Sequence, residues 1–330
     1  MRRVRLFPLE VGSLQDILTV TFNPAVDMST TTPEVSAGPK LRCEAPVFSA
    51  GGGGINVSRA IRILGGHSRA FVAAGGATGE QLGDLLAEEG IARIPFSAPG
   101  ETRTDVAVIE EASWDQFRYV TPGHTWRESD CELMLDSLCG MVSPSELVVL
   151  SGSLAPGMPV DVIRRIMQRF GGDVPKVICD ISGAPLADLC AHTGFGLEVL
   201  RMDHDEAKEI AGGPLASRED TARFAFSLVT KGVARIVIVA RGPDGSVLAT
   251  GAGCVHATGL DVPVDSKVGA GDSFVGAYVL AMATGIDATT ALQWGTTAAT
   301  SAVTTPAREL CRKSDFERYL PKCLLSDLAV

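Results

Sequence analysis

The sequence predicts an α/β fold: a doubly wound, mostly parallel β-sheet with helices on both faces, and a small β lid. Short apolar runs alternate with helix-like segments over most of the 330 residues. These runs are apolar at successive positions, which is typical of parallel strands that are covered on both faces. Strand and helix in alternation imply right-handed βαβ units, and therefore a doubly wound sheet.

The elements follow in order along the chain. The predicted strands occupy residues 17–22, 69–73, 147–150, 176–180 and 235–240. The predicted helices occupy residues 56–64, 79–89, 160–170, 205–211, 218–230, 272–283 and 287–303. Because Asp287 opens the last helix, we expect its carboxylate to cap that helix.

Two segments interrupt this alternation. Residues 28–48 and 102–120 are both strand-like, and 104–110 alternates with a period of two. We expect a strand pair outside the main sheet, forming a lid over one end of it. No Pro- or Ser-rich linker divides the rest, so we expect one domain over 16–330 after an N-terminal extension at 1–15.

Composition disfavours several classes of partner. The net charge is -10 and aromatic residues make up 5% of the chain, so a nucleic-acid surface is not expected. No apolar stretch approaches the roughly 20 residues that span a bilayer, so no membrane partner is expected. The eight cysteines contain no CxxC pair, which favours reduced thiols and a cytoplasmic location.

The first chemical motif is VGAGDS at 268–273, which leads into an apolar helix. Small residues at Gly269, Ala270 and Gly271 let backbone amides approach an anion, and the helix dipole adds positive potential. Asp272 beside that anion is suited to act as the base of a kinase. An ordinary glycine turn with Asp272 as a helix cap is the alternative.

Two further motifs are rich in glycine. GGGGINV at 51–57 runs into a helix, and a sugar-binding turn with Asn56 as a donor fits it better than a dinucleotide fingerprint, whose spacing differs. A glycine run needed only for packing is the alternative.

LSGSLAPG at 150–157 follows a buried strand, where ligands gather in open α/β sheets, and there Ser153 is a candidate donor. A plain connecting loop would look similar.

Together these strings resemble the ribokinase-like (PfkB) carbohydrate kinases, from about residue 17 to the end of the chain. The strings KLRC at 40–43, APVF at 45–48 and GGATGE at 75–80 resemble the ATP-dependent 6-phosphofructokinase branch. Many fructose-1-phosphate kinases carry Lys where this chain has Gly53, so the resemblance favours a 6-phosphate substrate.

The resemblance implies a role for each matching residue. Asp272 would be the catalytic base, with Gly269, Ala270 and Gly271 as the anion hole. The implied substrate-binding residues are Asp27, Lys40, Arg42, Gly51, Gly52, Asn56, Arg103 and Ser153. The implied nucleotide-binding residues are Arg201, Asp203, Arg241, Gly242, Gly245 and Lys267. The implied residues near the bound metal ion are Glu206 and Asp203. The implied cofactors are ATP and Mg²⁺, often assisted by K⁺.

The chain departs from the family pattern at three places. Asp203 replaces the family's Asn, and Arg201-Met202 replaces Lys-Pro. Lys267 replaces the usual Thr, and its ammonium could replace a bound K⁺, contact a nucleotide phosphate or point to solvent. Our hypothesis is the first of these, in which activity does not depend on K⁺. Residues 304–309 also lack the small and amide residues expected near that ion.

The expected reaction is phosphoryl transfer from ATP to the 1-hydroxyl of fructose 6-phosphate, giving fructose 1,6-bisphosphate. Tagatose-6-phosphate and fructose-1-phosphate kinase are alternatives within the same class, since these residues do not distinguish the sugars. A weakly active relative that binds sugar phosphate to regulate a partner is a further alternative. An NAD-dependent oxidoreductase is disfavoured, because no glycine fingerprint follows the first strand. The resemblance also implies a homodimer formed through the lids.

Overall fold

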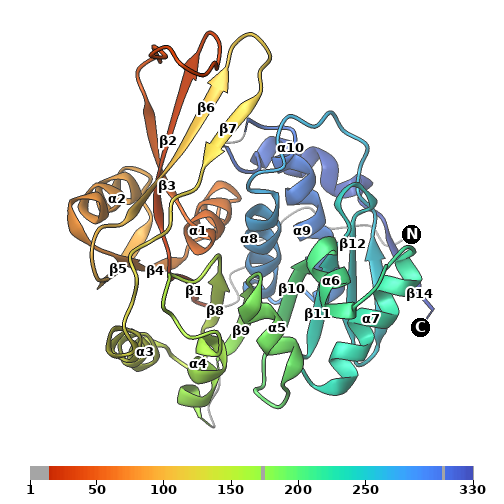
Figure 1. The fold of residues 1–330 in the computed structure, drawn as a ribbon. Helices are drawn as coiled ribbons and strands as arrows, with labels where there is room; N and C mark the ends of the chain where they lie inside the picture. The colour runs from red at the N-terminus through yellow and green to blue at the C-terminus, as the bar shows by residue number, and fades with distance from the viewer. Residues whose placement is uncertain (1–14, 172–174, 307–308, 330) are drawn as a thin grey trace.

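The computed structural model describes residues 15–171, 175–306 and 309–329. Its main sheet has ten strands in the order β14-β13-β12-β11-β10-β9-β8-β1-β4-β5 (Figure 1). From β5 to β11 neighbouring strands are parallel, and from β11 to β14 they are antiparallel. The strands are β1 (Ile17–Thr21), β4 (Arg69–Ala74), β5 (Ala92–Ser97), β8 (Leu147–Ser151), β9 (Lys176–Asp180), β10 (Val199–Asp203), β11 (Ile236–Ala240), β12 (Ser246–Thr250), β13 (Gly253–Ala257) and β14 (Leu325–Leu328).

Helices cover both faces of the main sheet, as the successive apolar residues of its strands require. On β8, Leu147 and Val149 pack into one core cluster, whereas Val148 and Leu150 pack into another on the opposite face. The first face carries α1 (Gly53–Ile63), α2 (Gly76–Glu88), α8 (Ala270–Ala283), α9 (Ala288–Ala302) and α10 (Lys313–Tyr319). The second carries α3 (Glu128–Met141), α4 (Val162–Phe170), α5 (Ala184–Ala191), α6 (His204–Ala211) and α7 (Arg218–Lys231). The predicted α/β class with a mostly parallel sheet is confirmed.

A separate sheet of four strands extends beyond the main sheet at one end (Figure 1). Its order is β3 (Val47–Gly51), β2 (Ala25–Thr32), β6 (Arg103–Glu110) and β7 (Gln116–Tyr119). β2 pairs in parallel with β6, and the two outer pairs are antiparallel. We call these four strands and their connections the lid. The expected strand pair is therefore a four-stranded sheet, and residues 33–46 of the strand-like segment contain no strand.

Two arrangements bring polar residues together at the base of the lid. β8, β9 and β10 are parallel, so their last residues, Ser151, Asp180 and Asp203, lie at the same edge of the sheet. In addition, α1 crosses α8 closely. A Cβ on Gly276 of α8 would lie 2.7 Å from the Cβ of Ala60 and 3.0 Å from the carbonyl oxygen of Val57, both on α1. The close crossing places the start of α8 beside the start of α1.

Most predicted elements are found with small shifts in their ends. The helices expected from 56 and 272 begin earlier, at Gly53 and Ala270. Asp287 caps α9 as expected, because its Oδ1 accepts hydrogen bonds from Thr289 N and Thr290 N at 3.1 Å. Residues 1–14 of the expected N-terminal extension lie outside the described residues. Across the described ranges, no helix combines the length and apolar character that crossing a bilayer requires.

Candidate active site

Asp272 lies in the first turn of α8, three residues after the N-cap residue Gly269, which has a φ of 74°. Its Oδ2 accepts a hydrogen bond of 3.0 Å from Nδ2 of Asn56 on α1. Burial raises the pKa of Asp272 to about 7, and the negative charge of Asp180 raises it further, whereas the bond from Asn56 lowers it. The carboxylate is thus directed toward α1, and helix capping alone does not describe it. A carboxylate with this pKa is suited to accept a proton near neutral pH.

A second carboxylate, Asp27 of β2, lies in the lid. Burial raises its pKa to about 6, with the negative charge of Asp105 adding to the effect and Arg103 opposing it. Asp105 is the register partner of Asp27 on β6, and its Oδ2 accepts from Arg103 Nη1 at 2.5 Å. A Cβ on Gly51 would collide with the Asp27 carboxylate, so the glycine at this position provides space for that side chain.

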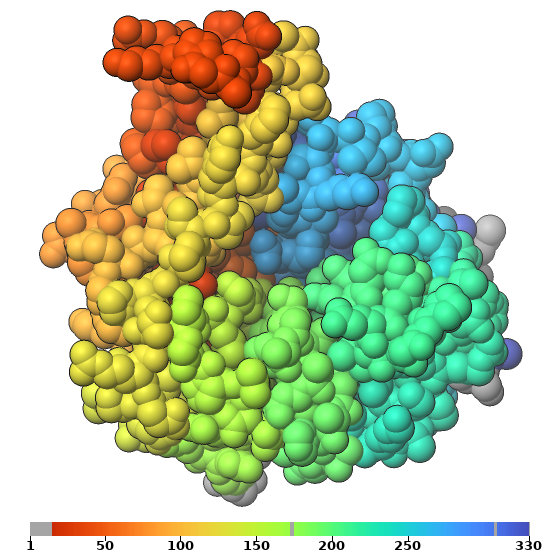
Figure 2. Space-filling model, viewed as in Figure 1, coloured from red at the N-terminus to blue at the C-terminus, as the bar shows by residue number. Residues whose placement is uncertain are grey.

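A pocket joins the lid to the start of α8, in the recess between the lid and the blue C-terminal part of the molecule (Figure 2). Its lid side includes Asp27, Asp105 and Arg118, and its opposite wall includes Gly269. Asn56, the partner of Asp272, also lines it. The pocket therefore offers carboxylates and guanidinium groups at once, which suits a polar ligand that carries hydroxyls and negative charge.

An ion pair packs against the turn of the VGAGDS motif. Arg201 Nη1 at β10 donates to Asp180 Oδ1 at 2.9 Å, and the guanidinium lies over the ring of Phe274 at 5.8 Å. A Cβ on Gly271 would lie 3.2 Å from Arg201 Nη1. Arg201 Nε is buried and has no hydrogen-bond partner among the described residues. A buried guanidinium nitrogen without a hydrogen-bond partner, next to the N-terminus of a helix, favours an anionic ligand at this place.

The glycines of the GGGGINV motif lie against other backbone segments. A Cβ on Gly53 would lie 2.6 Å from the backbone nitrogen of Gly152, and one on Gly54 would lie 2.5 Å from the carbonyl oxygen of Val20. Gly52 has a φ of 122°, which side chains with a Cβ rarely adopt. Close packing therefore explains why Gly53 and Gly54 are needed. It also brings this motif against the loop of the LSGSLAPG motif.

Asp203 and Glu206, the two residues expected near the metal ion, form a capping box at the start of α6. Asp203 Oδ1 accepts from Glu206 N at 2.9 Å, and Glu206 Oε2 accepts from Asp203 N at 2.7 Å. Burial raises the pKa of Glu206, and the charges of Asp203 and Asp180 add to this. In the described part of the chain, no group of three His, Cys, Asp or Glu side chains is arranged to hold a metal ion.

These carboxylates nevertheless suit Mg²⁺ that is bound mainly by water and substrate phosphates, with few protein ligands. Around the single guanidinium of Arg201 lie the carboxylates of Asp180, Asp203 and Glu206, so negative charge is in excess. Mg²⁺ keeps several waters and is held through one or two carboxylates together with substrate phosphates. Glu206 and Asp203 would supply oxygens of this kind toward Mg²⁺ on a nucleotide.

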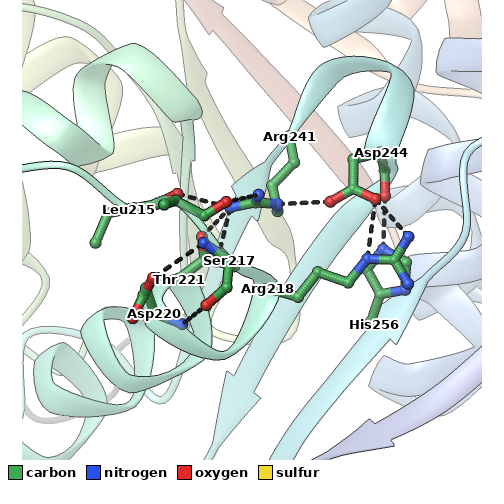
Figure 3. A network of polar contacts seen from close by, with 9 residues as sticks. Leu215, Ser217, Arg218, Asp220, Thr221, Arg241, Asp244 and His256 are labelled. Carbon is green, nitrogen blue, oxygen red and sulfur yellow. Dashed lines mark hydrogen bonds and ion pairs between the residues drawn. The ribbon is translucent and has the colours of Figure 1, made fainter.

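The turn at 241–245 is tied to the start of α7 (Figure 3). Nη1 of Arg241 donates to the carbonyl oxygens of Leu215 and Ser217, at 3.1 and 3.0 Å, and to the hydroxyl of Thr221. Hydrogen bonds from Arg218 hold the pKa of Asp244 well below its usual range, at about 2. The Arg241 guanidinium is thus occupied by hydrogen bonds to residues near the start of α7. A nucleotide at this turn would contact the backbone of the turn, including η1 (Gly242–Asp244).

The remaining predicted residues are more scattered. Lys40 and Arg42 are exposed in the lid connection between β2 and β3, and Lys267 is exposed before α8. Arg103 is committed to Asp105, and its Nε also donates to Asn23 O at 3.4 Å. The hydroxyl of Ser153 accepts from Asn23 Nδ2 at 3.4 Å, so it lies near the base of the lid.

Four residues near these groups were missed from the sequence. Asp180 ends a correctly predicted parallel strand, and a charged residue at that end is a signal for a site. Arg59 follows Asn56 by one helical turn, and the two therefore share a helix face. Asp105 and Arg118 lie on paired lid strands, whose register could not be derived from local patterns.

Comparisons with known proteins agree with this geometry. The pfkB family carbohydrate kinase model matches residues 20–313. ATP-dependent 6-phosphofructokinase isozyme 2 of Escherichia coli is 34% identical over 302 residues, covering 92% of this chain and 97% of its own. The Mycobacterium tuberculosis enzyme of the same name is 33% identical over 303 residues, covering 92% and 88%. The crystal structure of phosphofructokinase-2 from Escherichia coli in complex with potassium superimposes with a TM-score of 0.88 at 33% identity, covering 93% of this chain and 99% of that one. The chain therefore belongs to the pfkB family of carbohydrate kinases and is an ATP-dependent sugar kinase.

Proposed function

We propose that this chain is a 6-phosphofructokinase, which transfers the terminal phosphoryl group of ATP to the 1-hydroxyl of fructose 6-phosphate. The observation that carries the proposal is the position of Asp272. Its carboxylate lies in the first turn of α8, is held by Asn56, and has a pKa of about 7. The names of the relatives with 33% and 34% identity support the same substrate.

Each group of the site has a separate role in the proposed phosphoryl transfer. Asp272 accepts the proton of the sugar hydroxyl as the oxygen attacks phosphorus. The first amides of α8, at Ala270 and Gly271, would stabilise negative charge on the moving phosphoryl group, and Ala270 N is held in this structure only by a long bond of 3.4 Å to Lys267 O. Glu206 and Asp203 would hold Mg²⁺, which would supply positive charge toward the nucleotide phosphates. The lid closes the pocket and limits access of water.

The lid supplies the groups for the sugar phosphate. Asp27 accepts hydrogen bonds from sugar hydroxyls, and Gly51 leaves the space in which it does so. Arg118 lines the same pocket and offers a guanidinium to the phosphate. Arg103 would join it by exchanging its bond to Asp105 for one to the substrate.

A screen of acceptor sugars tests the proposal. ADP release is measured with fructose 6-phosphate, tagatose 6-phosphate and fructose 1-phosphate at equal concentrations. We expect fructose 6-phosphate to give the highest kcat/KM, and Asp272→Asn to lower turnover by several orders of magnitude while sugar binding persists. A preference for another sugar would reject the substrate, and near-normal turnover of Asp272→Asn would reject the base.

Fructose 1-phosphate is the second candidate substrate. The 1-phosphofructokinase of Bacillus subtilis is 28% identical over 312 residues, covering 94% of this chain and all of its own. The screen separates the two activities directly, because they act on different positions of the same sugar.

The lid also supports a proposal about assembly. Several large apolar side chains of the lid are exposed, among them Val47, Phe48 and Tyr119, at 49%, 39% and 56%. Covering them against a second copy would remove apolar surface from water. We therefore expect a dimer paired through the lids, measured by light scattering after size exclusion. A monomer at micromolar concentration would contradict it.

A further inference from the structure

Both polar ends of the Asn56 amide are occupied. Its Nδ2 donates to Asp272 Oδ2 at 3.0 Å, and its Oδ1 accepts from Arg59 Nη1 at 3.3 Å. An asparagine amide accepts at one end and donates at the other, whereas a guanidinium only donates. Because Arg59 must face the oxygen end, the donor end is left for Asp272. A reversed amide would direct oxygen toward a carboxylate.

Arg59 is itself held in place from the opposite side. Its Nε donates to Oε2 of Glu89 at 2.6 Å, and the two side chains are 19% and 31% exposed. Glu89 is the C-cap residue of α2, directly after the last helical residue Glu88, and Arg59 follows Asn56 by three positions on α1. A continuous series of hydrogen bonds therefore runs from Glu89 through Arg59 and Asn56 to Asp272. We call it the Glu89–Arg59–Asn56 chain.

We propose that Arg59 and Glu89 are positioning residues for phosphoryl transfer. Through Asn56 they fix the Asp272 carboxylate in the orientation in which it meets the hydroxyl of the acceptor sugar. The inference rests on the proposed role of Asp272 as the base, and it adds residues that touch neither the base nor the reacting atoms.

The charges around Asp272 are consistent with this role. The charged groups that face it are Asp180 from β9, Arg201 from β10 and Arg59 from α1. Arg201 is already paired with Asp180 at 2.9 Å. Arg59 is thus the second cation near the base, and its link to Asp272 passes through the amide of Asn56.

The competing role for Arg59 is direct binding of substrate, since it also lines the pocket beneath the lid. Steady-state kinetics separates the two roles. A positioning residue acts on kcat, because the error in orientation is felt at the reacting atoms. A residue that binds the sugar phosphate would instead raise its KM.

The variants are Arg59→Met and Glu89→Gln, with Arg62→Met as the matched control. Arg62 lies one turn further along α1 and donates from Nη1 to Gly90 O at 3.2 Å, so it also ties α1 to the end of α2. It is not part of the Glu89–Arg59–Asn56 chain. We expect kcat to fall about tenfold to a hundredfold in Arg59→Met, and less in Glu89→Gln, with KM nearly unchanged. Arg62→Met should retain normal kcat, and an equal loss in this control would overturn the proposal.

A double-mutant cycle tests whether Arg59 acts through Asn56. In an Asn56→Ala background, Arg59→Met should lower kcat by less than about twofold, since the link to the base is already gone. Full additivity, or a rise in sugar KM that persists in this background, would assign Arg59 to direct binding and overturn the proposal.

A structural readout keeps this inference separate from the proposed function. If the unmodified enzyme phosphorylates none of the phosphorylated ketohexoses, the proposed function fails. The crystal structure of Arg59→Met then still decides the role of Arg59. We expect the Asn56 amide to turn away from Asp272 Oδ2. An Asn56–Asp272 hydrogen bond retained at its original length would overturn the proposal whatever the substrate is.

Discussion

Replacing Asn56 with alanine should move the acidic limb of the pH–rate profile to higher pH. In the unmodified enzyme the pKa of Asp272 is raised to about 7 by burial, while the bond from Asn56 opposes that rise. Because the base must be ionised to accept a proton, kcat/KM should fall about tenfold between pH 8 and pH 6. A hydrogen bond to a charged group contributes about 1.5–3 kcal/mol, so its loss should raise the midpoint by about 1 to 2 pH units.

The assay is coupled ADP release at low fructose 6-phosphate, from pH 5.5 to 9, for both enzymes. The nucleotide titrates identically in the two series, so the difference between their midpoints belongs to the enzyme. Asn56→Ala will also lower the height of the profile, but the midpoint is independent of that loss. Coincident midpoints, or a midpoint near 4 in the unmodified enzyme, would refute the role assigned to Asp272.

Three further predictions concern stability and ions. The folded-state pKa of Asp272 is raised above its unfolded value of 3.8 to about 7, so its contribution to stability is lost as pH rises between these values. Asp272→Asn should therefore be the more stable protein by up to about 4 kcal/mol at pH 8 and about 2 at pH 5, and equal melting temperatures at pH 8 would contradict this. Gly276→Ala should cost about 1–3 kcal/mol and lower kcat, because its Cβ would lie 2.7 Å from the Cβ of Ala60. Gly140→Ala in α3 is the control for chemical denaturation, since no neighbouring atom lies within 4 Å of the Cβ added there. Finally, turnover should be unchanged when K⁺ is replaced by tetramethylammonium if the ammonium of Lys267 takes the place of that ion, whereas a strong loss would reject the hypothesis.

Much of the fold was predictable because the inner parallel strands, from β4 to β11, are largely buried on both faces. The parallel edge strand β5 is largely exposed, and it was not predicted from the sequence. Runs such as 147–150 and 235–240 have no alternative environment, and the structure places them in the interior of the main sheet. The helix α3 was missed, although Cys131, Met134, Leu135 and Leu138 repeat at helical spacing and are buried. Its apolar stripe is short and its other face is charged, so its periodic pattern is weaker than that of the longer apolar helices.

The site was only partly predictable, for a physical reason. The strings around Asp272 and Asn56 indicate helix starts next to small residues, which is local information. That the two side chains touch depends on how closely α1 and α8 cross, and Gly276 determines this from a position that no local motif marks. The pairing of Arg201 with Asp180 likewise follows from strand order. Pairings of this kind come from tertiary structure, and a single sequence does not contain them in readable form.

The contact between Asn56 and Asp272 closes a span of 216 residues. A chain emerging from the ribosome therefore carries half of its reactive centre long before the other half has been synthesised. Bringing such distant partners together costs loop entropy, and topologies rich in long-range contacts fold slowly. Regain of helical signal during refolding should consequently precede regain of turnover, so that catalysis reports the last event of folding and secondary structure an earlier one.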